Sequence, residues 1–155
     1  MAVQDTFIII KPDAMARGLA GSITARLEGK GLQLVGCKLT KLSDEILTEH
    51  YSHLADKPFF PGIVEFMQST AVLMQVWRGV DAVAVVRTLA GPTNGRDAAP
   101  GTIRGDFSQS IQCNVMHASD GPDTAREEVA RFFQPSEVLD WDRLNVRAFY
   151  GSDEE

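Results

Sequence analysis

The sequence has little cysteine and no long apolar segment. Its two cysteines, Cys37 and Cys113, lie far apart and form no Cys-x-x-Cys pattern, so both are expected to stay as thiols in a reducing compartment. No apolar run approaches the roughly 18 residues that a membrane span requires. The first residues, MAVQDTFIIIKPD, lack the basic start and apolar middle of a secretory signal. We therefore expect a cytoplasmic protein with no membrane segment.

The sequence also lacks an excess of positive charge. It holds 15 Lys and Arg against 21 Asp and Glu, a formal net charge of −6. Proteins dedicated to nucleic-acid binding depend on many basic side chains to neutralise phosphates. The aromatic strand with which some small α/β domains bind RNA is missing as well. The composition therefore argues against dedicated nucleic-acid binding, although it is compatible with one small anion site.

The chain of 155 residues shows no internal repeat and no low-complexity segment. Hydrophobic residues make up 44% and charged residues 23%, which is typical of globular proteins. This length predicts one domain, residues 1–155, with a sizeable core. The last five residues, GSDEE (151–155), are expected to form a solvated acidic tail.

Strand and helix patterns alternate along the chain. Strands are expected over residues 6–10, 32–42, 71–77 and about 112–116, and helices over 21–30, 44–53, 59–67, 82–89 and 122–133. Ser43, Asp81 and Asp120 are interpreted as helix caps, and Pro122 occupies the favoured first turn of the last helix. Four strands with intervening helices predict a small α/β sandwich in which helices cover a four-stranded sheet.

One long segment shows neither the helical nor the strand periodicity of apolar residues. Residues 91–111, GPTNGRDAAPGTIRGDFSQSI, would form a loop of a length that is uncommon in compact domains unless it is functional or disordered. Disorder is less consistent with its apolar residues Ile103, Phe107 and Ile111. The segment also carries Arg104, and it ends shortly before a histidine. It is therefore predicted to be an ordered, functional loop.

Metal and phosphate-loop motifs are missing. His50 and His53 are spaced i,i+3 on one predicted helix, but no further ligand lies near them in the sequence, so they are interpreted as part of a polar helix face. Cys113 and His117 alone are too few for a zinc site. The pattern G-x-x-x-x-G-K-[ST] does not occur, and no G-x-G-x-x-G follows a strand. If this protein binds a nucleotide, side chains must supply most of the phosphate contacts.

Scattered cations could supply those contacts. Lys11 ends the first predicted strand, Arg87 lies on the helix after Asp81, and Arg104 lies in the long loop. Guanidinium groups bind phosphate in a planar, bidentate manner, and lysine provides a mobile point charge. Thr93 and Asn114 can add neutral donors. Each cation alone is more readily explained as a surface charge, and only their convergence would make a site.

His117, in the stretch NVMHASD, is the candidate reactive group. Neutral imidazole is a competent nucleophile toward phosphorus, and an acceptor on its other nitrogen fixes the tautomer. The following helix offers Glu127 and Glu128, and it has an inward apolar stripe: Ala125, Val129 and Phe132. Glu128 borders that stripe whereas Glu127 points away. A His117–Glu128 pair, which Ser119 could join, is thus expected, and the spacing leaves open whether its role is functional or structural.

The motifs together resemble those of the nucleoside diphosphate kinase family. NVMHASDG is similar to that family's active-site signature, N-x-x-H-[GA]-S-D. Further matches occur in order along the chain: FIIIKPDAMARGL, KPFFPGIVEFM, VWRG, PGTIRGDF and the terminal LDW. The resemblance runs without apparent gaps from about Thr6 to Tyr150, and the combination of PGTIRGDF with the histidine signature is highly specific.

This resemblance implies a fold and an activity. The fold would be a ferredoxin-like βαββαβ sandwich, with a four-stranded antiparallel sheet and added helices. The activity would be transfer of the γ-phosphate of a nucleoside triphosphate, mainly ATP, to a nucleoside diphosphate. The route would be ping-pong, through a phosphohistidine formed at Nδ1 of His117. The alternative is a non-catalytic nucleotide-binding module of the same fold, which the presence of His117, Lys11 and Arg104 disfavours.

The resemblance also implies roles for individual residues. Glu128 would orient the imidazole, with support from Ser119. Phe59 would stack on the base with Ile111 opposite, an arrangement that tolerates different bases. Contacts to phosphates and ribose would come from the remaining matched residues: Lys11, Tyr51, Arg87, Thr93, Arg104 and Asn114. Mg²⁺ would arrive on the nucleotide phosphates, so no protein metal ligands are expected.

Some positions depart from the family pattern. Gly95 stands where many members have proline, Thr70-Ala71 replaces a common Gly-Pro, and Ala14 and Ala118 replace common glycines. None of these changes removes a proposed catalytic group. The family forms hexamers or tetramers, and the C-terminal extension through Tyr150 resembles that of hexameric members. A homohexamer built as a trimer of dimers is therefore expected, with a tetramer as the other possibility.

Overall fold

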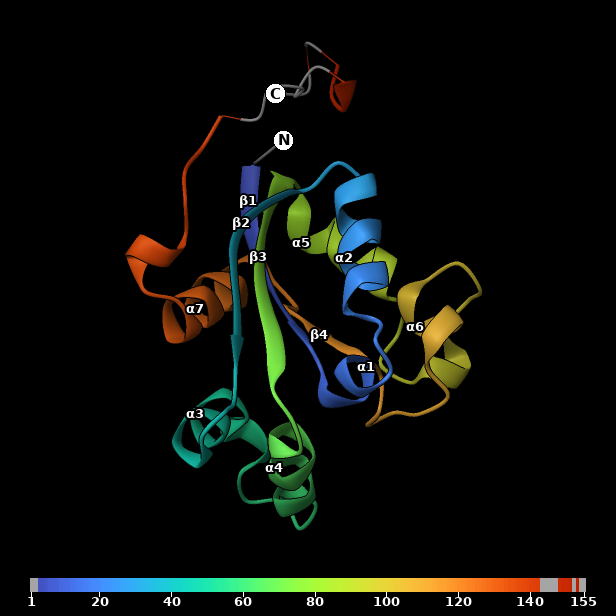
Figure 1. The fold of residues 1–155 in the computed structure, drawn as a ribbon, viewed down its shortest axis with the longest axis vertical. Helices are drawn as coiled ribbons and strands as arrows, with labels where there is room; N and C mark the ends of the chain where they lie inside the picture. Colours follow the sequence, from blue (N-terminus) through green and yellow to red (C-terminus); the bar gives the residue numbers. More distant parts are fainter. Residues whose placement is uncertain (1–2, 143–147, 152, 154–155) are drawn as a thin grey trace.

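A computed structural model describes residues 3–142, 148–151 and 153. Its four strands form one sheet in the order β2-β3-β1-β4, and every neighbouring pair is antiparallel (Figure 1). The strands are β1 (Val3–Ile10), β2 (Gln33–Thr40), β3 (Val72–Val80) and β4 (Met116–Ala118). This order and direction confirm the predicted ferredoxin-like sheet.

Helices connect the strands in βαββαβ order, with extra helices in all three connections and one more after β4. They are α1 (Pro12–Ala16), α2 (Ala20–Gly29), α3 (Asp44–His50), α4 (Phe60–Gln68), α5 (Ala82–Ala90), α6 (Ile103–Phe107) and α7 (Pro122–Phe132). Short 3₁₀ turns occupy Ser52–Leu54, Gly95–Asp97 and Pro135–Glu137. Among the described residues, the helices are all too short or too polar to cross a membrane.

Strand β1 is the centre of the core. Phe7, Ile8, Ile9 and Ile10 are all fully buried, because helices cover both faces of the sheet at this strand. Ile8 and Ile10 belong to the apolar cluster on the side of α2 and α5, whereas Phe7 and Ile9 belong to the cluster on the side of α7 (Figure 1). Burial on both faces explains why the sequence here is a continuous apolar run rather than an alternation.

Aromatic packing fixes helix α7 against this strand. The ring of Phe7 stacks on Phe132 with centroids 4.7 Å apart and contacts the edge of Phe133 at 6.2 Å. Both partners lie at the C-terminal end of α7 or directly after it. The same face of α7 carries Glu128 one turn earlier, so this packing sets where that carboxylate lies.

Several element boundaries differ from the prediction. The prediction of a strand near residues 112–116 is wrong, because β4 covers Met116–Ala118 and so contains His117 itself. Val115 has a positive φ of 66°, which no regular strand can accommodate, and the strand begins only after it. The helix expected to reach residue 53 ends at His50. The cap at Ser43 is confirmed, because its hydroxyl accepts from the Ile46 N–H.

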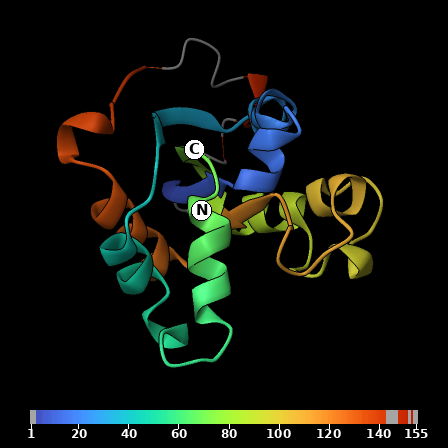
Figure 2. The ribbon, with the colours of Figure 1, turned by 60° about the horizontal axis from the view of Figure 1, so that its bottom comes forward.

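The long segment 91–111 is ordered, as predicted, but it contains a short helix that was not predicted. It contains α6, whose first turn is capped by the Thr102 hydroxyl accepting from Gly105 N–H at 3.0 Å. A helix of five residues is too short to show a helical pattern in the sequence. Gly95 N–H donates to Ser110 O at 3.2 Å, and a side chain at position 95 would collide with Ser108. Glycine therefore fits at position 95, where a side chain would not. In Figure 2, α4 (green) lies in front at the centre of the view and this segment (yellow) lies to its right.

We predict that Phe7→Ala lowers the free energy of unfolding by about 3–5 kcal/mol, because it removes the ring stack and leaves a cavity under α7. Val3→Ala is the matched control, since Val3 lies on the same strand and its side chain is 63% exposed; we expect it to cost about 0.5 kcal/mol or less. Urea denaturation at fixed protein concentration measures both. Equal losses in the two variants would contradict this account of the core.

Candidate active site

Two cavities adjoin at the end of the sheet beside α4 and the 91–111 loop. One has a volume of about 540 Å³ and is here named the apolar cavity; it is lined by Lys11, Tyr51, Leu54, Phe59, Ile63, Phe66, Met67, Ile111 and Gln112. The other has a volume of about 520 Å³ and is named the polar cavity; it is lined by Lys11, His50, Tyr51, His53, Arg87, Thr93, Arg104, Met116, His117, Ala118, Asp120, Thr124 and Glu128. Lys11 and Tyr51 line both cavities, so one ligand can extend through the two.

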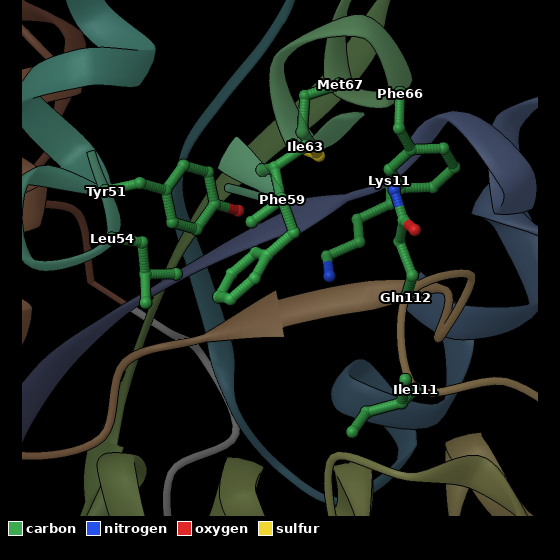
Figure 3. Close-up of a pocket in the computed structure, with 9 residues that line it drawn as sticks. All are labelled: Lys11, Tyr51, Leu54, Phe59, Ile63, Phe66, Met67, Ile111 and Gln112. Carbon is green, nitrogen blue, oxygen red and sulfur yellow. The ribbon is translucent and has the colours of Figure 1, made fainter. Parts of the chain in front are cut away.

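The apolar cavity is an open slot between two walls. Phe59, just before α4, and Ile111, in the opposite loop, project from opposite sides of it (Figure 3). Phe59 is 56% exposed and Ile111 is 62% exposed, so the apolar surfaces of both are accessible to a ligand in the slot. Gln112 Nε2 donates to Gly62 O at 3.2 Å and joins the two walls at one end. A slot of this kind suits a flat, partly apolar ring such as a nucleobase.

Three cations converge on the polar cavity: Lys11, Arg87 and Arg104. Lys11 Nζ donates to Asn114 Oδ1 at 2.7 Å. Burial, followed by the nearby Arg104 charge, lowers the pKa of Lys11 to about 8, while Asp13 acts in the opposite direction. Burial and mutual repulsion make the charged forms of these side chains less stable. An anion that enters the cavity offsets both effects and is therefore bound favourably. The convergence that sequence spacing left open is thus present in the structure.

Arg104 has two tasks in this cavity. Its buried guanidinium donates to three backbone carbonyls, Gly91 O at 2.7 Å, Asn114 O at 3.3 Å and Met116 O at 2.7 Å. Burial and the charge of Arg87 lower the pKa of Arg104 to about 10, so it remains a cation at neutral pH. A guanidinium has five N–H donors, and the two that these bonds leave over can meet an anion.

A strained turn precedes the histidine. Met116 N–H donates to Asn114 O at 2.8 Å across Val115, whose φ is 66°. A three-residue turn with positive φ is rare, and for a β-branched residue it costs of order 1–3 kcal/mol. The flanking carbonyls are held by Arg104, and Lys11 N–H donates to Val115 O at 2.9 Å. The turn is therefore fixed from several sides and delivers His117 to the polar cavity.

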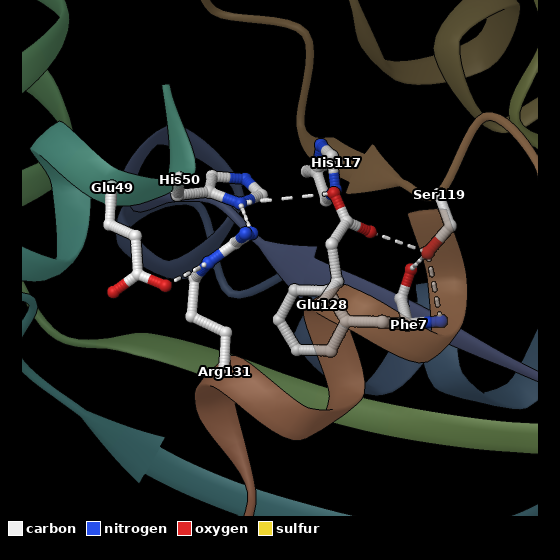
Figure 4. Close-up of polar contacts among 7 residues, drawn as sticks. All are labelled: Phe7, Glu49, His50, His117, Ser119, Glu128 and Arg131. Atoms are coloured by element: carbon white, nitrogen blue, oxygen red, sulfur yellow. Dashed lines mark hydrogen bonds and ion pairs between the residues drawn. The ribbon is translucent and has the colours of Figure 1, made fainter. Parts of the chain in front are cut away.

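His117, Glu128 and Ser119 form a short hydrogen-bonded chain (Figure 4). His117 Nε2 lies 2.9 Å from Glu128 Oε1, and the Ser119 hydroxyl donates to Glu128 Oε2 at 2.5 Å. Ser119 Oγ also accepts from Phe7 N–H at 3.2 Å, which ties the chain to the central strand. Glu128 and Ser119 are buried, whereas His117 is only half-buried and faces the cavity.

The charge on Glu128 decides the tautomer of His117. Burial alone would raise the pKa of Glu128, but the hydrogen bond and charge of His117, together with Ser119, hold it below its usual value. An ionised carboxylate only accepts hydrogen bonds, so His117 Nε2 must carry the proton. The lone pair of neutral His117 is then on Nδ1. The pair thus presents a nucleophilic nitrogen, oriented by a buried carboxylate.

The structure brings the predicted site residues together. Those that line one or both cavities are Lys11, Tyr51, Phe59, Arg87, Thr93, Arg104, Ile111, His117 and Glu128. Asn114 and Ser119 lie directly behind them: Asn114 holds Lys11 and donates to Thr93 O at 2.9 Å, and Ser119 holds Glu128. Burial, followed by the charge of Glu128, raises the pKa of Tyr51 to about 12, so its phenol remains a donor.

Two predictions near the site were wrong. His50 is buried rather than part of a polar helix face, and it lies beside His117 and Glu128. Its spacing of three residues from the buried Leu47 could have indicated an inward position. Asp120 does not cap α7, because Gly121 holds the N-cap position and no side chain bonds there; Asp120 lies exposed at the rim of the polar cavity.

The described part of the chain contains one set of His, Cys, Asp or Glu donors within 4.8 Å of one another: His50, His117 and Glu128. Their facing atoms are already engaged, because His117 bonds Glu128 and Arg131 Nη1 donates to His50 Nδ1 at 3.4 Å. A cation between them would have to displace this guanidinium. We therefore interpret the set as a hydrogen-bond network.

Comparisons with known proteins all match nucleoside diphosphate kinases. Residues 4–138 match the family model described as nucleoside diphosphate kinase. The chain is 53% identical over 152 residues to the nucleoside diphosphate kinase of Parabacteroides distasonis, covering 98% of this chain and 99% of that protein. It is 46% identical over 136 residues to nucleoside diphosphate kinase A of Rattus norvegicus, covering 88% and 90%. The solved structure of the halophilic nucleoside diphosphate kinase from Halobacterium salinarum in complex with CDP superposes with a TM-score of 0.94 at 45% identity, covering 97% of this chain and 100% of that one.

The lowered pKa of Lys11 leads to a pH prediction. A group of pKa near 8 is roughly 90% charged at pH 7 and roughly 10% charged at pH 9. We expect the affinity for inorganic pyrophosphate, measured by calorimetry, to fall about tenfold more over this range in the wild type than in Lys11→Arg, which stays charged throughout. The variant corrects for titration of the ligand itself. Identical pH dependence in both proteins would show that Lys11 does not bind the anion.

Proposed function

Because the chain belongs to the nucleoside diphosphate kinase family, it is a nucleotide phosphotransferase, and we propose that it carries the transferred phosphate on Nδ1 of His117. The observation that supports this proposal most strongly is the 2.9 Å contact between His117 Nε2 and the buried Glu128 carboxylate. That contact directs the free lone pair away from Glu128, and His117 lines a cavity with three cations.

The proposed reaction has two mirrored steps. His117 Nδ1 attacks the γ-phosphorus of a nucleoside triphosphate, the Nδ1–P bond forms, and the bond from phosphorus to the bridging oxygen breaks. The nucleoside diphosphate leaves with the electron pair of that bond. Glu128 stabilises the positive charge that develops on the imidazole, and Ser119 keeps the carboxylate in place. A second nucleoside diphosphate then attacks the phosphorus and restores neutral His117, which is ping-pong transfer.

The cations of the polar cavity are proposed to hold the phosphates. Lys11 and Arg87 stabilise negative charge on the oxygens, and Arg104 contributes its two remaining N–H donors while it holds the backbone. Thr93 and the Tyr51 phenol add neutral donors. We propose that the substrate enters as its Mg²⁺ complex, with the ion on the phosphate oxygens, where it neutralises charge that the protein does not.

The apolar cavity is proposed to hold the base and ribose. The base lies between Phe59 and Ile111, where stacking gives affinity without reading hydrogen bonds. Such a slot accepts several bases, which suits an enzyme that moves phosphate from ATP to other nucleoside diphosphates. Asn114 is proposed to support the ribose or phosphate end through its hydrogen bond with Lys11. A non-catalytic nucleotide-binding role is not favoured, because the full set of reactive and cationic groups faces one cavity.

We further propose a homohexamer arranged as a trimer of dimers, with a tetramer as the alternative. Strand β2 supports self-association, because it forms an edge of the sheet and exposes 62% of Leu39. Part of the C-terminal extension, residues 143–147, and part of the acidic tail, residues 152 and 154–155, lie outside the described residues.

A cytoplasmic location is also proposed: Cys37 and Cys113 are exposed free thiols, which suits a reducing compartment.

Incubation with γ-labelled ATP and Mg²⁺ tests the carrier directly. We expect the wild type to take up acid-labile, alkali-stable label, because a phosphorus–nitrogen bond hydrolyses in acid and survives base. His117→Ala should take up none. His53→Ala is the matched control, since His53 is an exposed histidine at the rim of the same cavity, and it should be labelled. Label that persists in His117→Ala at the wild-type level would exclude His117 as the carrier.

A further inference from the structure

His50 forms a wall of the polar cavity directly beside the proposed carrier. Its ring meets the ring of His117 edge-on, with centroids 4.7 Å apart and an interplanar angle of 82°. It also contacts Tyr51 at 4.6 Å and Phe132 at 5.1 Å, both edge-on. With its side chain 2% exposed, His50 is enclosed by these rings and cannot turn away from His117 without disturbing them. Figure 4 shows His50 between Arg131 and the His117–Glu128 pair.

Arg131 determines which nitrogen of His50 carries the proton. Arg131 Nη1 lies 3.4 Å from His50 Nδ1, and a guanidinium can only donate. His50 Nδ1 is therefore the acceptor, and the proton of the neutral ring is on Nε2, a buried atom without a hydrogen-bond partner in the described structure. Arg131 is itself held by Glu49, whose Oε1 accepts from Arg131 Nε at 2.9 Å. The connection thus runs from a surface carboxylate to a buried imidazole.

The acceptor state of His50 matters because of Glu128. His50 Nδ1 lies 3.8 Å from Glu128 Oε1, the same oxygen that accepts from His117 Nε2 at 2.9 Å. A His50 protonated on Nδ1 would be a second, charged donor for that oxygen. It would draw the carboxylate from His117 and weaken the bond that orients the nucleophile.

We propose that Arg131, held by Glu49, is a positioning residue that keeps His50 Nδ1 unprotonated and so reserves Glu128 for His117. This inference rests on the proposed role of His117 as phosphate carrier. It assigns a task to an arginine that lies behind the site and does not line either cavity.

The charges around His50 support this arrangement. Burial lowers the pKa of His50 to about 3, the charges of His117, Arg131 and His53 act in the same direction, and Glu128 opposes them. A lowered pKa means that His50 is neutral at every pH at which the enzyme is expected to work. Loss of Arg131 removes one like charge and frees Nδ1 for a proton, so the pKa of His50 should rise. The groups that face His50 are thus His117 from β4, Glu128 and Arg131 from α7, Tyr51 next to it, and His53 from the turn after α3.

Single-turnover phosphorylation by γ-labelled ATP, followed from pH 5.5 to 8, tests the proposal. In Arg131→Met the rate should fall more steeply toward acid than in the wild type, because the pKa of His50 then rises from its lowered value and a larger share of His50 carries a proton on Nδ1 as the pH falls. Arg126→Met is the matched control: Arg126 is an exposed arginine on the same helix that pairs with Asp123, and its profile should follow the wild type.

A second variant separates competition for Glu128 from simple damage to the helix. His50→Phe in the Arg131→Met background keeps an aromatic wall but cannot be protonated, so the double variant should recover the wild-type profile. ¹⁵N NMR of the histidine side chains, with His50 assigned by the loss of its signal in His50→Phe, should show the proton on Nε2 and a neutral ring at pH 6 in the wild type.

An Arg131→Met profile that superimposes on the wild type would overturn the proposal. So would a double variant that keeps the steep acid limb, or an NMR spectrum with the proton of His50 on Nδ1. If the wild type takes up no label at any pH, the carrier role of His117 fails instead. The NMR measurement needs no turnover, and its comparison between the wild type and Arg131→Met decides even then whether Arg131 sets the tautomer of His50.

Discussion

The site depends on one buried charge, the carboxylate of Glu128. Removing a carboxylate from water costs several kcal/mol unless donors replace the lost hydration. Here Ser119 donates to one oxygen and His117 to the other. The pKa of Glu128 stays low for that reason, and the ionised form leaves His117 one arrangement, with Nε2 protonated and Nδ1 free. The chemistry of the histidine is thus set by how the fold satisfies the glutamate.

The backbone on the other side of His117 is held just as firmly. Val115 adopts a conformation that costs free energy, and Arg104 offsets this cost by bonding the carbonyls before and after it. The same guanidinium faces the polar cavity. One side chain therefore stabilises the turn that positions the nucleophile and contributes to the anion site. This double use means that losses of stability and of activity at Arg104 are coupled.

Much of the fold could be predicted from local patterns. The apolar run at residues 6–10 indicated a strand, and the inward stripe of α7 placed Glu128 at the edge of the core; both predictions are confirmed. Sequence spacing could not show that Lys11, Arg87 and Arg104 converge, because their meeting depends on the positive φ of Val115 and on the register of β4 against β1. The α6 helix was missed because five residues do not show a period. His50 was misplaced because its neighbours come from β4 and α7, far away in the sequence.

The most direct test of this account is to locate the phosphate on the ring of His117. Wild-type protein phosphorylated by ATP and Mg²⁺ can be kept at alkaline pH and studied by ¹H–¹⁵N and ³¹P NMR, which distinguish a phosphorus bound to Nδ1 from one bound to Nε2. The Glu128 hydrogen bond predicts phosphate on Nδ1, with the proton retained on Nε2. Phosphate on Nε2 would contradict the account, because that nitrogen is the one assigned to the carboxylate.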